Sequence, residues 1–239
     1  MEPMRLNKFL SSAGVCSRRE ADRWIGEGRV LVDGKTAEPG QKVDENSEVT
    51  VDGRKVGQRQ EEVLLAVYKP QGIVCTTAEH RGEKNIVDLV HYPERIYPVG
   101  RLDKASEGLI LMTNIGEITD QILRGSNYHE KEYLVKIDRP VTLDFLNQMR
   151  SGVPVLDTVT RPCQVKKVGP DSFRIILTQG LNRQIRRMCE ALGCRVVFLK
   201  RLRVMNITLG SLKPGEYRKI EGDEKEQLFA LLGGVRPKK

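Results

Sequence analysis

The pattern of short apolar runs after residue 62 constrains the fold of this 239-residue chain more than any other feature. Runs rich in β-branched residues predict strands, and apolar residues at helical spacing predict helices. The expected strands are Val63–Lys69, Leu109–Thr113, Glu132–Ile137, Phe173–Thr178, Val196–Leu199 and Val204–Thr208. The expected helices are Ile86–Val90, Glu117–Leu123, Leu143–Met149, Arg183–Leu192 and Asp223–Leu232. Because strands outnumber helices and do not alternate regularly with them, we expect an α+β domain with a mixed, largely antiparallel sheet over residues 63–235.

Residues 1–55 predict a separate, smaller domain. Leu6, Phe9 and Leu10 have helical spacing, and the stretch Ser17-Arg18-Arg19-Glu20 can form a capping box that begins a second helix. Asp-Gly pairs between apolar runs, at positions 33–34 and 52–53, predict hairpin turns. The polar residues from 54 to 62 lack apolar periodicity, so we expect a linker there.

This helix–helix–hairpin pattern, with arginines along one helix stripe, resembles the S4 RNA-binding module. The resemblance is carried by Arg5–Leu10, Gly14–Ala21 and Gly28–Gly34. It implies contacts with RNA by the basic side chains of Arg5, Lys8, Arg18, Arg19 and Arg23. The alternative is a small α/β domain whose arginines only keep it soluble.

The charge distribution favours a nucleic-acid partner. The net charge is +8, and the segment from Arg174 to Arg203 holds eight basic residues but one acid, Glu190. Arginine binds phosphate bidentately, so such a cluster suits RNA; a solvated basic face is the alternative. No apolar run is long enough to span a membrane, and the N-terminus lacks a signal-peptide core, so we expect a cytoplasmic protein without a membrane partner. Five scattered cysteines and three scattered histidines predict no metal site.

Asp103 is the leading candidate for a reactive group. The stretch Gly100-Arg101-Leu102-Asp103-Lys104 places one carboxylate in a glycine-flanked loop directly before an apolar strand. Loops held by rigid strands are common places for reactive groups. With no histidine or cysteine nearby in sequence, Asp103 would act as a nucleophile or base without a metal; a structural salt bridge is an equally good interpretation from this motif alone.

A second candidate segment is Gly180–Met188, which combines a helix start with basic residues. We expect Asn182 to cap the helix and Gly193 to end it. The arginines of its first turn lie where free N–H groups and the helix dipole already favour anions. A phosphate or a carboxylate is a suitable partner there.

Two strand residues complete the set. Lys69 comes just before Pro70 and Gly72, which stop strand pairing, so its side chain would extend from a rigid strand end. Tyr133, near the start of a strand, can offer a flat ring for a base to stack on. An ordinary strand-ending turn and a core tyrosine are the alternatives.

Together these segments resemble the pseudouridine synthases, in the branch typified by RsuA that joins an S4 module to the catalytic domain. The matching motifs are Lys69-Pro70-x-Gly72, Gly100–Asp103 followed by Gly108-Leu109, and Gln184–Met188. Within the branch, His129–Val135 and Gly180–Gln184 look most like an enzyme of large-subunit ribosomal RNA. The resemblance covers nearly the whole chain.

The resemblance implies isomerisation of a specific uridine to pseudouridine in ribosomal RNA, most closely the 23S RNA, without a cofactor. Asp103 would be the essential carboxylate, Arg186 the cation that keeps it ionised, and Tyr133 the ring that stacks on the base. Further RNA contacts are expected from Lys69, Arg101, Arg183, Arg187 and Arg201. The sequence leaves open the exact uridine, a transfer RNA as a second substrate, and whether Asp103 attacks the sugar carbon or abstracts a sugar proton. A monomer is favoured.

Two other function classes remain at this point. A non-catalytic RNA-binding or assembly factor would use the same basic surface, but Asp103, Tyr133 and Arg186 would not need to meet. An RNA hydrolase built on Asp103 would need a second carboxylate or metal ligands, and Glu107 is the only acid close in sequence.

Overall fold

The computed structural model describes residues 3–57, 61–77 and 82–233. The chain divides into two compact units. One holds Met1–Glu62 with Pro93–Arg95, and the other holds Val63–Tyr92 with Ile96–Lys239. Residues 58–60 of the expected linker, and the end of the expected second domain at 234–235, lie outside the described residues.

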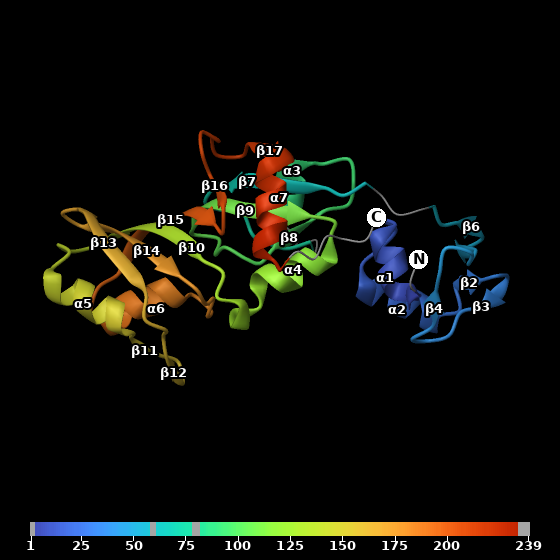
Figure 1. Ribbon diagram of the computed structural model, residues 1–239, viewed down its shortest axis with the longest axis horizontal. Coiled ribbons are helices and arrows are strands. Elements are labelled where there is room, and N and C mark those ends of the chain that lie inside the picture. Colours follow the sequence, from blue (N-terminus) through green and yellow to red (C-terminus); the bar gives the residue numbers. More distant parts are fainter. Residues whose placement is uncertain (1–2, 58–60, 78–81, 234–239) are drawn as a thin grey trace. The chain divides into compact units, whose positions relative to one another are not determined.

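The first unit pairs two helices with short strands (Figure 1). Its helices are α1 (Leu6–Ser12) and α2 (Arg18–Gly26). Its strands are β1 (Met4–Arg5), β2 (Val30–Val32), β3 (Lys35–Thr36), β4 (Lys42–Val43), β5 (Val49–Val51) and β6 (Arg54–Lys55). They form two sheets, with the orders β3-β2-β5-β6 and β1-β4. Strand β6 uses residues 54–55, so the polar stretch expected to be linker contributes to this sheet.

Local turn and capping chemistry explains these elements. Ser17 accepts a hydrogen bond from the backbone N–H of Glu20 at 3.1 Å, as the capping box predicts, whereas the Glu20 carboxylate accepts from Arg23. Both hairpin turns have positive φ angles, 52° and 78° at positions 33–34 and 48° and 75° at positions 52–53. Asp-Gly pairs adopt this conformation readily, so the two predicted hairpins are confirmed.

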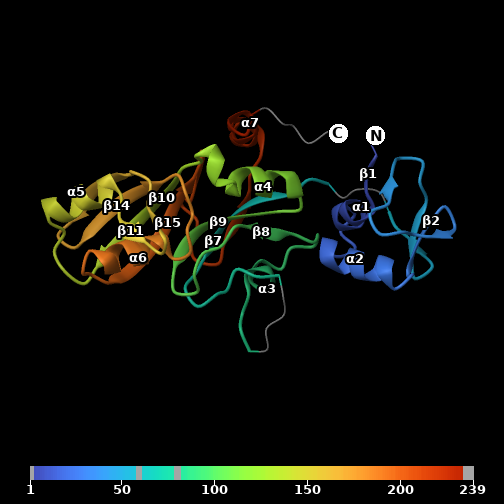
Figure 2. The same ribbon diagram turned by 90° about the horizontal axis from the view of Figure 1, so that it is seen from below.

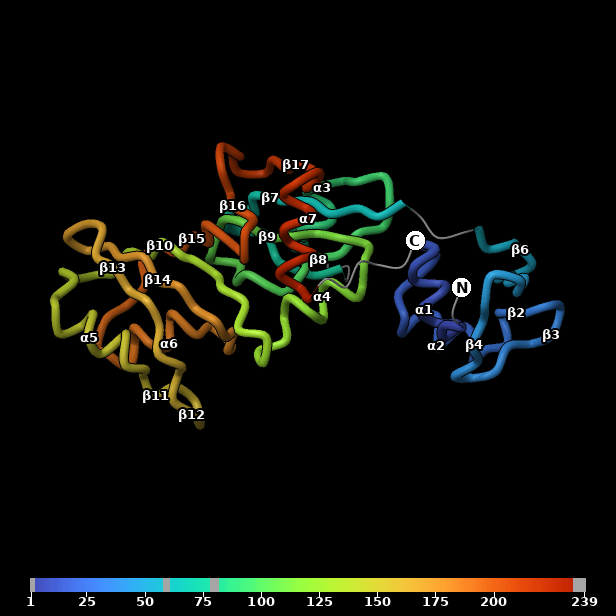
Figure 3. Tube along the Cα trace, viewed as in Figure 1, coloured from blue at the N-terminus to red at the C-terminus, as the bar shows by residue number. Residues whose placement is uncertain are grey.

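The second unit is built on one nine-stranded sheet. Its main path runs β13-β14-β10-β15-β9-β7-β17, while β16 pairs with β15 and β8 with β9. The strands are β7 (Leu64–Lys69), β8 (Tyr97–Val99), β9 (Glu107–Thr113), β10 (Lys131–Ile137), β13 (Gln164–Gly169), β14 (Ser172–Leu177), β15 (Val196–Val204), β16 (Ile207–Thr208) and β17 (Tyr217–Lys219). Among these described strands every pairing is antiparallel except β9 with β15. Figure 3 traces the path of the chain through these strands. The expected mixed, largely antiparallel sheet is confirmed.

Helices cover this sheet in separate groups (Figure 2). They are α3 (Ile86–Val90), α4 (Gly116–Leu123), α5 (Leu143–Ser151), α6 (Gln184–Ala191) and α7 (Gly222–Leu231), with a 3₁₀ turn η1 (Gly125–Asn127) and a small hairpin of β11 (Pro154–Val155) and β12 (Thr158–Val159). Helices α4 and α7 bury apolar residues against one face of β7 and β9, and α3 packs on the opposite face. Helices α5 and α6 form a second core with β10, β13 and β14.

Three local predictions need correction. The expected strands at 196–199 and 204–208 are instead one long strand, β15, followed by β16, because the basic residues between them continue the pairing with β10. Helix α6 is not capped by Asn182: Arg183 takes the cap position with φ 51°. Strands β8, β11, β12, β13 and β17 were not predicted, since most are short or lack apolar alternation.

Candidate active site

The loop that carries Asp103 connects β8 to β9 and is held by backbone contacts on both sides. The N–H of Leu102 donates to Cys75 Sγ at 3.3 Å, and the N–H of Gly72 donates to the carbonyl of Lys104 at 2.8 Å. Within the loop, the N–H of Ser106 donates to the carbonyl of Asp103 at 3.0 Å. The loop backbone is therefore fixed before and after the carboxylate.

Gly108 allows the strand after this loop to approach β15 closely. It lies opposite Arg201 in the parallel pairing and has φ +107°. A Cβ at this position would lie 2.3 Å from the carbonyl oxygen and 2.6 Å from the nitrogen of Arg201. Only glycine fits this contact, which brings the Asp103 loop next to the strand that follows α6.

Arg186 of α6 joins the loop to β15. Its guanidinium donates to Ser106 Oγ at 3.0 Å, to the carbonyl of Ala105 at 3.3 Å and to the carbonyl of Val196 at 3.3 Å. Its Nε lies 3.6 Å from Asp103 Oδ2 and has no other polar partner among the described residues, and its side chain is 11% exposed. A cation fixed in this way is a permanent neighbour of the carboxylate, because arginine does not lose its proton in proteins.

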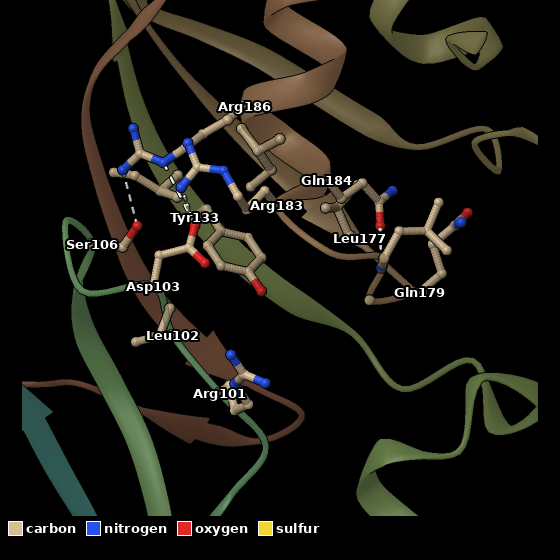
Figure 4. A pocket seen from close by; sticks show the side chains of 14 residues that line it. Arg101, Leu102, Asp103, Ser106, Tyr133, Leu177, Gln179, Arg183, Gln184 and Arg186 are labelled. Atoms are coloured by element: carbon tan, nitrogen blue, oxygen red, sulfur yellow. Dashed lines mark hydrogen bonds and ion pairs between the residues drawn. The ribbon is translucent and has the colours of Figure 1, made fainter. Parts of the chain in front are cut away.

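Arg183 places a second cation on the same carboxylate. Its Nη1 lies 3.6 Å from Asp103 Oδ2, but its side chain is 45% exposed. Figure 4 shows Asp103 pointing toward both guanidinium groups. The first turn of α6 thus meets a carboxylate, one of the two partners that its arginines were predicted to suit. Arg187 instead donates to the carbonyl and side chain of Asn182.

Asp103 faces an open pocket whose empty volume is about 460 Å³, solvent at its mouth included. Tyr133 on β10 and Arg101 lie beside the carboxylate, whereas Leu177, Gln179 and Gln184 lie across the pocket (Figure 4). Ligand pockets of this size usually combine apolar walls with a few polar groups. Asp103, Tyr133, Arg183 and Arg186 come from three separate segments, and all four line this pocket. The role of Gln179 and Gln184 as walls was missed, because neither is a charged or aromatic residue.

Lys69 and Arg201 were expected on the RNA-binding surface, but both side chains are buried, at 0% and 4% exposure. The Lys69 ammonium donates to the carbonyl of Pro70 at 2.8 Å, and Arg201 Nε donates to the carbonyl of Leu109 at 2.6 Å. The expectation of surface contacts is therefore wrong for these two residues. Instead they fix backbone carbonyls just after β7 and within β9.

Burial shifts the ionisation of groups around this loop. Burial lowers the pKa of Lys69, although Cys75, Asp103 and Glu107 favour its charged form. Burial also raises the pKa of the Cys75 thiol. On β10, burial and, to a smaller extent, the positive charge of Arg201 together lower the pKa of Lys131 to about 8. These shifts follow the usual penalty for charge away from water.

The basic residues expected on the first unit differ in their surroundings. Arg5, Arg18, Arg19 and Arg23 are exposed, and Lys8 is half-buried. Arg23 forms ion pairs with Glu20, one turn earlier on α2, at 3.3 Å and with Glu27, the residue that caps the end of α2, at 3.8 Å. The exposed guanidinium groups of this unit lie in solvent, where they can contact a polyanion.

The described residues contain neither a membrane-spanning helix nor a metal cluster. No described helix is long and apolar enough to cross a membrane. Over residues 3–57, 61–77 and 82–233, no group of three His, Cys, Asp or Glu side chains could hold a metal ion.

Comparison with known proteins identifies both units. Residues 63–191 match the family model described as RNA pseudouridylate synthase, and residues 4–49 match that of the S4 domain. The chain is 52% identical to "Dual-specificity RNA pseudouridine synthase RluF" of Salmonella typhi, over 96% of this chain and 80% of the relative. The same enzyme of Escherichia coli K12 is 50% identical over 98% and 83%.

A more distant relative and a solved structure also match over nearly the whole chain. "Ribosomal large subunit pseudouridine synthase B" of Bacillus subtilis is 35% identical over 95% of this chain and 96% of its own length. A solved structure, "Crystal structure of pseudouridylate synthase", superimposes with a TM-score of 0.69 at 25% identity, covering 95% of this chain and 99% of that one.

Proposed function

This chain belongs to the RNA pseudouridine synthase family, and on that premise we propose that it isomerises a specific uridine of large-subunit (23S) ribosomal RNA with Asp103 as the essential group. The observation that carries the proposal is the convergence of Asp103, Tyr133 and Arg186 on one pocket. These residues lie on the loop before β9, on β10 and on α6, so the fold rather than the sequence order brings them together.

The geometry supplies what the reaction requires. In the isomerisation the bond between C1′ and N1 breaks, uracil turns, and a bond forms between C1′ and C5, while C5 loses a hydrogen and N1 gains one. Asp103 assists this exchange in its ionised form, by attack on the sugar carbon or by removal of a sugar proton. Arg186 keeps a fixed positive charge 3.6 Å from the carboxylate and orients it.

Tyr133 and the rest of the pocket receive the base. The target uridine must leave the RNA stack, at a cost of a few kcal/mol. Stacking on the ring of Tyr133 offsets part of that cost. Contacts of arginines with phosphates offset more. Among the arginines predicted to bind RNA on this unit, Arg101 and Arg183 are exposed and Arg187 is half-buried.

The first unit supplies a second RNA-binding surface. Its exposed residues Arg5, Arg18, Arg19 and Arg23, with Lys8, would contact phosphates of the folded RNA. Relatives named for ribosomal large-subunit and dual-specificity RNA modification support large-subunit RNA as the substrate and a transfer RNA as a candidate second one. The enzyme would act as a cytoplasmic monomer.

The test is the replacement Asp103→Asn, which keeps shape but removes the charge. We expect the variant to bind RNA and to make no pseudouridine in unmodified ribosomal RNA, measured by chemical mapping of pseudouridine. Asp120→Asn on the exposed surface of α4 is the matched control and should keep full activity. Turnover by Asp103→Asn would disprove the assigned role, and an inactive wild-type protein on every RNA tested would favour the non-catalytic RNA-binding factor.

A further inference from the structure

Tyr128 is an exposed aromatic residue held in an unusual conformation. It follows the 3₁₀ turn η1, has φ 55° and ψ 27°, and is 60% exposed. Left-handed backbone is uncommon for a bulky residue. The turn before it is pinned, because the backbone N–H of Asn127 donates to Arg124 and its side-chain amide donates to Gln121, at 3.0 and 2.9 Å.

Arg161 covers one face of this ring. Its guanidinium carbon lies 4.0 Å from the ring centroid of Tyr128. The guanidinium is itself fixed, because Nη1 donates to the carbonyl of Gly125 at 2.8 Å and to that of Thr178 at 3.3 Å. Among the described residues no carboxylate forms an ion pair with Arg161. The stack therefore keeps its positive charge, and the large exposed fraction of Tyr128 leaves ring surface open to solvent.

The stack adjoins the wall of the catalytic pocket. The backbone N–H of Arg161 donates to Gln179 Oε1, and Gln179 and Leu177 line the pocket across from Asp103 (Figure 4). Tyr128 is not part of the pocket lining. A group that binds Tyr128 would thus lie outside the pocket but within reach of the same RNA strand.

We propose that Tyr128, held from behind by Arg161, is a second stacking subsite that takes an unpaired nucleobase flanking the uridine in the pocket. The inference rests on the proposed function and adds a site for a neighbouring nucleotide. Every base has a π face, so an exposed ring binds one without reading its edge. A guanidinium behind the ring adds positive charge close to the phosphates on either side of that base.

The test measures the binding and turnover of a stem-loop RNA that carries the target uridine. Tyr128→Ala should raise Kd and KM roughly five- to a hundredfold, the range that base–aromatic stacking gives, and leave kcat near its wild-type value. Tyr128→Phe keeps the ring and should behave as wild type. Tyr217→Ala, an exposed tyrosine on the far edge strand β17, is the matched surface control and should also behave as wild type.

A change in the RNA identifies the partner base. Abasic nucleotides are placed one at a time on either side of the target uridine. At one position the abasic nucleotide should raise the Kd of the wild-type enzyme by the same factor as Tyr128→Ala does on intact RNA. The abasic nucleotide at that position should not raise the Kd of Tyr128→Ala any further. Additive losses at every position, or an unchanged Kd for Tyr128→Ala on RNA that the wild type converts, would overturn the subsite alone. Failure of the wild type to convert any RNA would instead overturn the proposed function.

Discussion

Gly108→Ala tests whether the close approach of β9 and β15 builds the active site. The added Cβ would lie 2.3 and 2.6 Å from backbone atoms of Arg201, and backbone cannot rotate aside as a flexible side chain can. The strands must separate, which disrupts the parallel pairs Lys200↔Glu107 and Arg201↔Gly108. Alanine also pays a conformational cost at φ +107°. Because the clash and this cost add, we expect Gly108→Ala to lower the free energy of unfolding by at least about 3 kcal/mol.

A second glycine separates the clash from the backbone strain. Gly215 has φ +90°, and a Cβ there would meet only Leu89 Cδ1 at 4.0 Å, an ordinary contact. Gly215→Ala should therefore lose about 1 kcal/mol, the usual cost of alanine at positive φ. The difference between the two variants measures the steric contact alone.

Urea unfolding followed by two probes gives the readout. The only tryptophan, Trp24, lies in the first unit, so its fluorescence reports that unit, whereas far-UV circular dichroism also follows the second. We expect Gly108→Ala to shift the circular-dichroism transition and to leave the Trp24 transition unchanged. Pseudouridine formation should fall with it, because the loop bearing Asp103 precedes β9. Equal losses for Gly108→Ala and Gly215→Ala would refute the reasoning.

Two further predictions concern Lys131 on β10 and Cys75, which contacts the loop that carries Asp103. Burial and Arg201 lower the pKa of Lys131 to about 8, so the Lys131 ammonium holds its proton more tightly in the unfolded chain than in the folded one. The charged ammonium therefore destabilises the folded state fully below pH 8, and this destabilisation fades as the pH rises toward 10.5. Lys131→Met should therefore raise the free energy of unfolding by about 1–2 kcal/mol at pH 7. Urea titrations should show this gain in stability shrinking above pH 8, and a gain that stays constant with pH would contradict the prediction. Cys75→Ala removes the acceptor of the Leu102 N–H, so kcat should fall about tenfold or more at unchanged RNA affinity in single-turnover assays. Cys163→Ala, a partly buried thiol in the other core, should keep kcat, and equal effects of the two would argue against loop positioning.

Sequence patterns predicted the second unit well where apolar periodicity is strong. Helix α3 has the predicted bounds, and α4 and α5 begin within one residue of the predicted positions. The hairpins of the first unit follow from their Asp-Gly turns, whose conformation is a local property. Strand β13 has two adjacent exposed lysines, Lys166 and Lys167, which break the apolar alternation; it is formed by pairing with β14.

The sequence predicted which residues form the candidate site, but it did not predict which of the neighbouring cations are buried. Motif resemblance placed Asp103, Tyr133 and Arg186 together, and the structure brings all three to one pocket. The same reasoning treated Lys69 and Arg201 as surface cations. Their burial depends on which strands flank them: Arg201 turns its guanidinium toward the carbonyl of Leu109 because β9 lies beside β15, and a sequence does not state strand order.

The one parallel pairing among the described strands of this sheet explains why distant segments meet. Parallel strands begin at the same edge of a sheet, so the segments that precede them arrive there together. The Asp103 loop precedes β9, and α6 precedes β15. Arg186 bonds the carbonyls of Ala105 and Val196, which lie at the starts of these two strands. The ion pair of Asp103 and Arg186 is thus a consequence of β9 and β15 running side by side in one direction, and an antiparallel β15 would carry α6 to the opposite edge, away from Asp103.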